Sequence, residues 1–117
     1  MKPPPLLVHV AVLLGAAFAA AYAAAAADPQ PTRQRELVSM VRQDCGSCHG
    51  LTLAGGLGPA LLPHALAEKP VDSMVATVMN GRPGTAMPGW SRFMSEPEAE
   101  WVVRELMRGF PAAGEAR

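Results

Sequence analysis

Aromatic side chains are scarce in this 117-residue chain: phenylalanine, tryptophan and tyrosine together make up 5% of it. A core with so few rings needs another filler, and a flat apolar cofactor would serve. The chain also lacks an excess of charge, since its formal net charge is +0. Nucleic-acid-binding proteins carry a basic stripe, so we expect no nucleic-acid partner.

The chain is long enough for one domain only. Residues 6–26 are apolar apart from His9 and Tyr22, and they end in a row of alanines. This pattern predicts a signal peptide over residues 1–27 and a single domain over residues 28–117, exported to the periplasm. An uncleaved membrane anchor that faces the periplasm is the alternative, because the run is about as long as a spanning helix. The remaining domain is small enough to need a staple such as a metal, a disulfide or a cofactor.

Neither strands nor internal repeats are indicated, so we predict an all-α domain of three or four short helices between Gly/Pro-rich loops. The first helix is expected after a Thr32 cap and up to Asp44, with Leu37, Met40 and Val41 buried and Arg42 on the other side. The later helices are expected over residues 63–69, from an Asp72 cap to Asn80 with Gly81 as its stop, and from a Ser95–Glu98 capping box to Gly109, with Ala99, Val102, Val103 and Leu106 buried.

Only two cysteines are present, Cys45 and Cys48, and His49 follows directly. A disulfide between them would close a tiny loop and stabilise little. A thioredoxin-like pair needs a βαβ context, and a zinc site needs four ligands at recognised spacings. Covalent haem attachment through Cys-x-x-Cys-His is favoured. Two cysteines three apart lie on one side of a helical turn and can reach both vinyl groups of one porphyrin edge, which places His49 beneath the iron.

The other side of the iron then needs a ligand, since methionine gives an electron-transfer site and an open position gives ligand binding or catalysis. Met87 is the candidate, because it lies in an irregular loop, Gly84-Thr85-Ala86-Met87-Pro88-Gly89-Trp90. The other methionines of the domain fit helical apolar faces or packing beside a helix cap, and are expected to fill the core. His64 is the rival axial ligand.

Taken together, Cys45 to His49, Leu57-Gly58-Pro59-Ala60-Leu61, and Gly84 to Met87 followed by Trp90 resemble class I cytochrome c. The resemblance covers nearly the whole of residues 28–117. It implies one haem c held through Cys45 and Cys48, with His49 as proximal and Met87 as distal ligand of the iron. It also implies that the Pro59 carbonyl accepts a hydrogen bond from the non-ligating nitrogen of His49.

Within that family, Asp44 to Leu51, Gly55 to Leu61 and Gly81 to Pro88 are similar to the small monohaem cytochromes encoded with dissimilatory nitrite reductase. That resemblance implies a monomeric, non-enzymatic electron carrier in denitrification that donates to the reductase carrying haem c and haem d. The alternative role is in maturing the haem d cofactor or the reductase. A haem enzyme with an open sixth site is a third hypothesis, which the Met87 loop disfavours.

Overall fold

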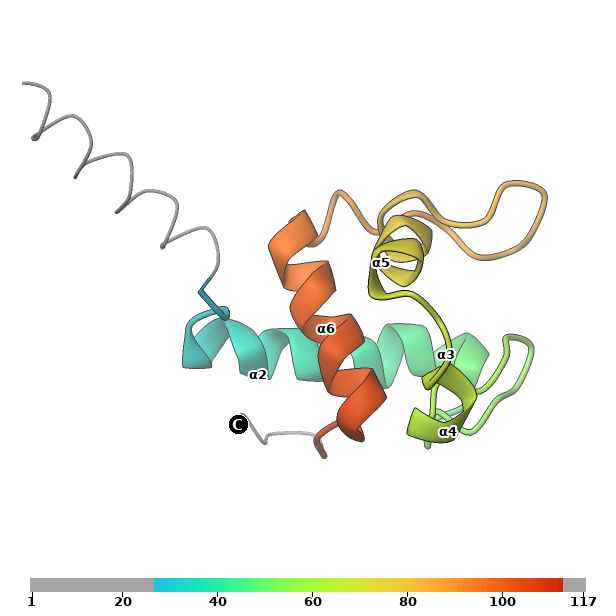
Figure 1. Cartoon of the computed structure of the whole chain (residues 1–117), viewed down its shortest axis with the longest axis horizontal. Helices are drawn as coiled ribbons and strands as arrows, with labels where there is room; N and C mark the ends of the chain where they lie inside the picture. The colour runs from blue at the N-terminus through green and yellow to red at the C-terminus, as the bar shows by residue number, and fades with distance from the viewer. Residues whose placement is uncertain (1–26, 113–117) are drawn as a thin grey trace, which may run out of the picture.

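The computed structural model describes residues 27–112, and all regular structure in this range is helical, as predicted (Figure 1). The expected signal peptide therefore lies outside the described residues, apart from its last residue. None of the described helices is long and apolar enough to cross a membrane. The elements are α2 (Pro31–Met40), η1 (Val41–Cys45), α3 (Gly46–His49), α4 (Pro63–Leu66), α5 (Val71–Asn80) and α6 (Glu96–Arg108).

The first three elements form one continuous helical segment. It begins at Pro31, with Gln30 as the capping residue, so the prediction of a Thr32 cap was wrong. Proline is favoured at a first helical position because its missing N–H would have no partner there. The segment widens into a π-helical turn in η1 and ends only at Gly50, where φ is +85°. The predicted end at Asp44 was too early, and the Cys-x-x-Cys-His motif is itself helical.

Helix α6 crosses α2, and the apolar core lies between them (Figure 1). Leu37 and Val41 are fully buried, as predicted, whereas Met40 is half-buried and Val38 takes a place in the core. Each fully buried aliphatic side chain of this kind stabilises the fold by about 1.5–3 kcal/mol. The predicted stripe of α6 is confirmed as well. Its buried members are Ala99, Val102, Val103 and Leu106.

Helix α5 packs against α6 on another side. It begins at Val71 after a Pro70 cap, so Asp72 is not the cap that was predicted. Asp72 lies in the first turn, where a carboxylate still interacts favourably with the helix dipole. The predicted stop at Gly81 is confirmed, and its φ of +70° suits glycine.

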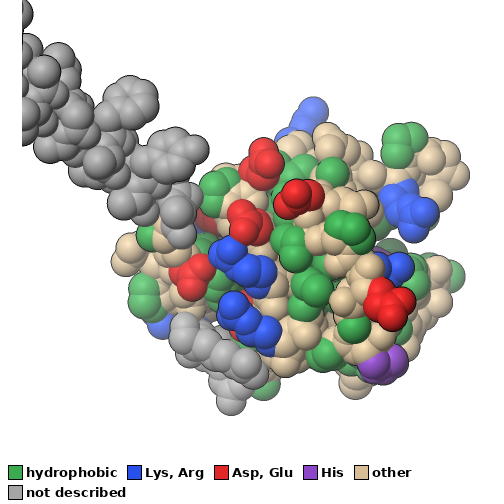
Figure 2. Space-filling view, in the orientation of Figure 1, with side chains coloured by type: hydrophobic (Ala, Val, Ile, Leu, Met, Phe, Trp, Pro, Cys, Tyr) green, Lys and Arg blue, Asp and Glu red, His purple; other side chains and the backbone are tan. Residues whose placement is uncertain are grey.

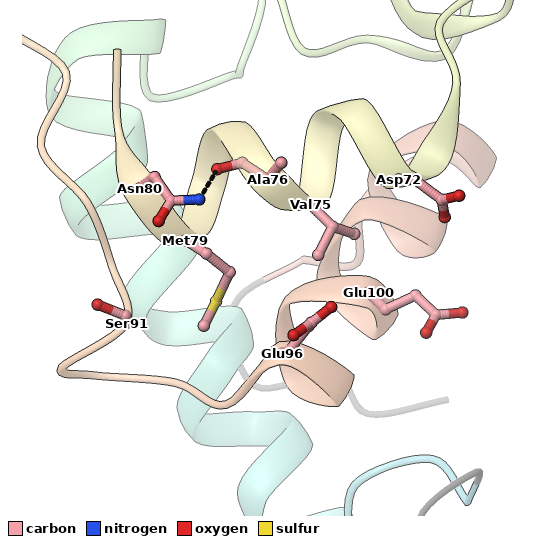
Figure 3. Close-up of a pocket in the computed structure, with 8 residues that line it drawn as sticks. All are labelled: Asp72, Val75, Ala76, Met79, Asn80, Ser91, Glu96 and Glu100. Carbon is pink, nitrogen blue, oxygen red and sulfur yellow. Dashed lines mark hydrogen bonds between the residues drawn. The ribbon is translucent and has the colours of Figure 1, made fainter. Parts of the chain in front are cut away.

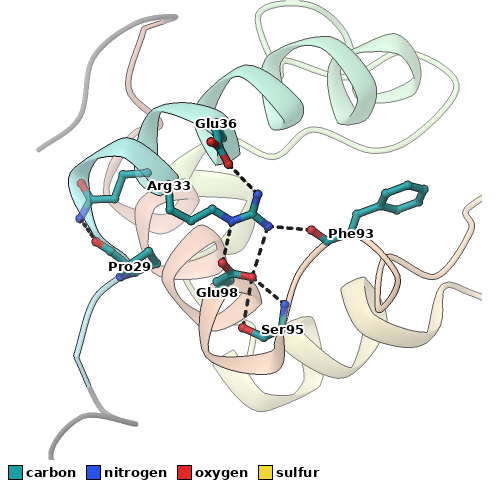
Figure 4. A network of polar contacts seen from close by, with 7 residues as sticks. Pro29, Arg33, Glu36, Phe93, Ser95 and Glu98 are labelled. Atoms are coloured by element: carbon teal, nitrogen blue, oxygen red, sulfur yellow. Dashed lines mark hydrogen bonds and ion pairs between the residues drawn. The ribbon is translucent and has the colours of Figure 1, made fainter.

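The charged side chains at the two ends of α6 have the signs that the helix dipole favours. Acidic Glu96 and Glu98 lie in its first turn and Arg108 in its last. Figure 2 shows acidic side chains gathered over the first half of α6 and basic ones over its second half. The predicted capping box is present, since the Ser95 N–H donates to Glu98 Oε2 at 2.7 Å. The same carboxylate pairs with Arg33 of α2 (Figure 4), which ties the two crossing helices together.

Candidate haem site

The helical segment η1–α3 carries the three residues of the attachment motif. Cys45 is the last residue of η1 and is half-buried, whereas Cys48 is exposed. His49 ends α3 and is buried. Burial, and then the charge of Asp44, raises the pKa of the free Cys45 thiol to about 11. At neutral pH this thiol is therefore protonated.

The His49 ring is held by a backbone carbonyl ten residues further on. Its Nδ1 lies 2.7 Å from the Pro59 carbonyl oxygen. A carbonyl can only accept a hydrogen bond, so Nδ1 must carry the proton and donate it. The neutral ring then has an unprotonated Nε2 whose lone pair is free to bind a metal. The hydrogen bond therefore fixes both the tautomer and the orientation that a haem iron needs.

The loop between His49 and Pro59 wraps closely around the motif. The Gly58 N–H donates to the Cys48 carbonyl at 2.8 Å. A Cβ atom at Gly58 would lie 2.7 Å from two atoms of the His49 ring. One at Gly56 would lie 2.8 Å from the Cys48 carbonyl oxygen. These two glycines let the backbone approach the motif in a way that no other residue would allow.

Met87 lies in a second loop, residues 81–93, which follows α5. Figure 1 shows that this loop and the loop after α3 extend on the same side of the molecule as α3. The Met87 side chain is half-buried and does not belong to the apolar core. The other five methionines of residues 28–117 belong to that core or pack against it, as expected for core filler. They are Met40, Met74, Met79, Met94 and Met107.

His64, the rival axial ligand, is an exposed residue of the short helix α4. Pro59 is brought into direct contact with His49, as the family resemblance implied. Sequence reasoning did not find the role of Gly58, although its place directly before Pro59 in a glycine-rich run was a signal of close backbone approach.

A pocket of about 320 Å³ lies elsewhere, between α5 and the first turns of α6. Figure 3 shows the carboxylates of Asp72, Glu96 and Glu100 along this pocket, with Met79 at its other end. None of the residues predicted to hold haem is among its lining residues. Acidic side chains would also repel the propionates of a haem. The Cys-x-x-Cys-His motif, rather than this pocket, therefore marks the haem site.

Helices that cross around an apolar core, with a helical Cys-x-x-Cys-His motif at one side, define a c-type cytochrome. Residues 32–104 match the family model described as cytochrome c oxidase, cbb3-type, subunit III. Over 88 residues the chain is 54% identical to cytochrome c55X of Stutzerimonas stutzeri, covering 75% of this chain and 78% of that protein. The chain belongs to this family of c-type cytochromes, and its cofactor is one haem c attached through Cys45 and Cys48.

Two solved structures place it more narrowly. The c-type cytochrome NirC is 54% identical and superposes with a TM-score of 0.68, over 69% of this chain and 95% of that one. Dihydro-haem d1 dehydrogenase NirN is 32% identical with a TM-score of 0.56, over 63% of this chain but only 16% of that one. The predicted class I cytochrome c fold and the resemblance to the small cytochromes of nitrite reductase clusters are confirmed. The chain is an electron-transfer protein rather than an enzyme.

Proposed function

We propose that this chain is a periplasmic carrier of single electrons whose haem iron is held by His49 and Met87. The observation that carries the proposal is the hydrogen bond from His49 Nδ1 to the Pro59 carbonyl, because it leaves Nε2 free for the iron. Met87 supports it, since its thioether is held in a loop outside the core. When bound, haem c supplies an iron that takes up and releases one electron.

The absorption spectrum of protein matured with haem in a periplasm tests the ligand assignment. We expect sharp c-type bands on reduction and the weak long-wavelength methionine-to-iron band on oxidation. Carbon monoxide should leave the ferrous spectrum unchanged at neutral pH. Met87→Ala should abolish the weak band and allow carbon monoxide to bind, whereas His64→Ala should match the wild type. Loss of the band in His64→Ala, or its survival in Met87→Ala, would contradict the assignment.

The partner that we propose is the dissimilatory nitrite reductase that carries haem c and haem d, with this chain as its electron donor. The support is the similarity to NirC and cytochrome c55X. Without the predicted signal peptide, which contains Lys2, the chain has nine basic and ten acidic residues. A surface so close to neutral offers little long-range steering, so docking would depend on apolar contacts around the haem edge.

Two exposed leucines beside the attachment motif suit such contacts. Leu51 is 75% exposed and Leu57 is 94% exposed. Leu51 lies against the motif, since its Cα is 3.5 Å from where a Cβ at Gly46 would stand. Leu57 lies between Gly56 and Gly58, and both glycines approach the Cys48 carbonyl or the His49 ring. We infer that these two exposed apolar side chains take part in a small, transient protein contact beside the motif.

Stopped-flow mixing of the reduced cytochrome with oxidised nitrite reductase tests the partner and the surface. We expect a second-order rate that changes little with salt, and a rate about tenfold lower in Leu57→Glu. Ser73→Glu, at an exposed residue of α5, adds the same charge elsewhere and should leave the rate unchanged. Absence of electron transfer would overturn the partner, and a steep fall with salt would overturn apolar docking.

A role in maturing haem d is the second candidate. The similarity to dihydro-haem d1 dehydrogenase NirN favours it, because a dehydrogenation releases two electrons that one-electron carriers must accept one at a time. Deletion of the gene decides between the two roles. Full haem d content in the reductase of the deletion strain would count against the maturation role, whereas reductase lacking haem d would favour it.

A further inference from the structure

The loop that carries Met87 is closed by a side chain from within the loop itself. Thr85 Oγ1 donates a hydrogen bond to the Arg82 carbonyl oxygen at 2.7 Å and accepts one from the Met87 N–H at 3.3 Å. A hydroxyl has one hydrogen and two lone pairs, so it makes both bonds at once. We propose that the Thr85 hydroxyl is a positioning group, which holds the Met87 backbone so that the thioether stays on the iron. The proposal rests on the ligand assignment made above.

The ends of the loop are fixed by backbone packing. The Arg82 N–H donates to the Met87 carbonyl at 3.1 Å, and the Thr85 N–H donates to the Arg82 carbonyl at 3.0 Å. A Cβ at Gly81 would lie 2.6 Å from the Met87 carbonyl oxygen, and one at Gly89 would lie 2.7 Å from the Met79 carbonyl oxygen. These contacts hold the start and the end of the loop together at the end of α5.

Within the loop, Met87 is attached at its carbonyl to Arg82 and at its N–H to Thr85. Loss of the hydroxyl would leave the carbonyl attachment in place and release the N–H. The Met87 backbone could then turn about its carbonyl, and the thioether would leave the iron more often. Among the described residues, Thr85 is the side chain that hydrogen-bonds to both the Arg82 carbonyl and the Met87 N–H.

Thr85 is exposed, so its role is not that of a core residue. Replacing its hydroxyl by a methyl group leaves no buried cavity, and water can take up the freed polar groups. Loss of the hydroxyl should therefore change the free energy of methionine dissociation by about as much as one or two ordinary hydrogen bonds contribute. That corresponds to about a five- to tenfold rise in the equilibrium constant for losing the methionine.

Competition by imidazole for the ferric iron measures the equilibrium constant for losing the methionine. The haem-loaded protein is titrated with imidazole while the weak long-wavelength methionine-to-iron band disappears. Four variants are compared. Thr85→Val removes the hydroxyl at nearly constant shape, Thr85→Ser keeps it, Met87→Ala removes the thioether, and Thr77→Val is the matched control. Thr77 Oγ1 also donates to a backbone carbonyl, that of Ser73 at 2.9 Å, but within α5.

We expect Thr85→Val to bind imidazole about five- to tenfold more tightly than the wild type, whereas Thr85→Ser and Thr77→Val bind it like the wild type. Equal affinity in Thr85→Val and Thr77→Val, with tight binding in Met87→Ala, would overturn the role of Thr85 and leave the ligand assignment standing. Wild-type affinity in Met87→Ala would overturn the ligand assignment and the role of Thr85 together.

Discussion

Arg33 Nε donates a hydrogen bond to Glu98 Oε1 at 2.7 Å and so joins two helices across 65 positions of sequence (Figure 4). The guanidinium also donates to Glu36 at 2.9 Å and to the Phe93 carbonyl at 2.7 Å. Glu98 in turn accepts the Ser95 N–H as part of its capping box. One arginine thus connects α2, α6 and the end of the loop that carries Met87.

This pair gives the fold a defined dependence on pH. The hydrogen bond from Arg33 lowers the pKa of Glu98 against a smaller opposing effect of burial, and the hydrogen bonds of Ser95 and then the charge of Arg33 lower it further. Because the folded pKa is depressed, the pair stabilises the fold above the carboxyl's unfolded pKa of about 4.3. That stabilisation is lost as the pH falls through the lower folded pKa. Glu98→Gln keeps an acceptor for the cap but removes the charge, and should cost about 1 kcal/mol at pH 7.

Unfolding of the haem-loaded protein by guanidinium chloride between pH 3 and pH 7 measures the stabilisation by the Arg33–Glu98 pair. The difference between wild type and Glu98→Gln should shrink as the pH falls below about 4. Glu96→Gln is the control, since Glu96 shares the first turn of α6 and takes part in none of the ion pairs of the described residues. A cost that is independent of pH, or equal in the control, would contradict the assignment to the Arg33 pair.

Local signals predicted the helix ends that depend on neighbouring residues alone, but they failed at the Thr32 and Asp72 caps. The Ser95–Glu98 box and the Gly81 stop depend on neighbouring residues only, and both are confirmed. Trp101 and Glu105 were missed, although both are buried. Helix α6 contacts α4 and α5 as well as crossing α2, so it buries more than the single stripe that its periodicity indicates.

The candidate site likewise combines residues that local signals predict with contacts that only the tertiary structure shows. Cys45, Cys48 and His49 are recognisable from spacing alone, since their chemistry is confined to five adjacent positions. The close approach of Gly58 to the His49 ring, by contrast, depends on the path of the loop that returns to this ring. A distance between a glycine and a ring nine positions earlier follows from tertiary structure. The hydrogen bonds of Thr85 are local in sequence, but they require a loop conformation that glycine and proline permit without specifying it.

Arg42 was predicted to lie on the side of the first helix opposite its buried stripe, and the structure shows that it contacts residues 110 and 111. Its guanidinium donates to the carbonyls of Phe110 at 2.7 Å and of Pro111 at 2.8 Å and 2.9 Å, and lies 5.5 Å from the centre of the Phe110 ring. Arg42→Gln should lower the free energy of unfolding by about 1–2 kcal/mol. Arg35→Gln, at an exposed residue of α2, should change it by less than about 0.5 kcal/mol. Equal effects in the two variants, measured by denaturant unfolding, would argue against this clamp.

The approach of Gly58 to the His49 ring makes the sharpest prediction about the site. Its φ is not in the left-handed region, so alanine fits the backbone and its Cβ is the only addition. That Cβ would lie 2.7 Å from two ring atoms, so the ring or the loop must move and the Pro59 hydrogen bond must lengthen. We expect Gly58→Ala to lose about 1–3 kcal/mol of stability and to incorporate less haem.

The measurements are haem per protein after maturation in a periplasm and the reduction potential of whatever holoprotein forms. The potential should shift, because the hydrogen bond on Nδ1 sets how strongly His49 donates to the iron. Gly46→Ala is the matched control inside the motif. Its Cβ would stand at an ordinary 3.5 Å from the Leu51 Cα, in a helical position where alanine is favoured. Full haem content and an unchanged reduction potential in Gly58→Ala would show that the His49 ring tolerates the displacement. The close approach of Gly58 would then not position the ring.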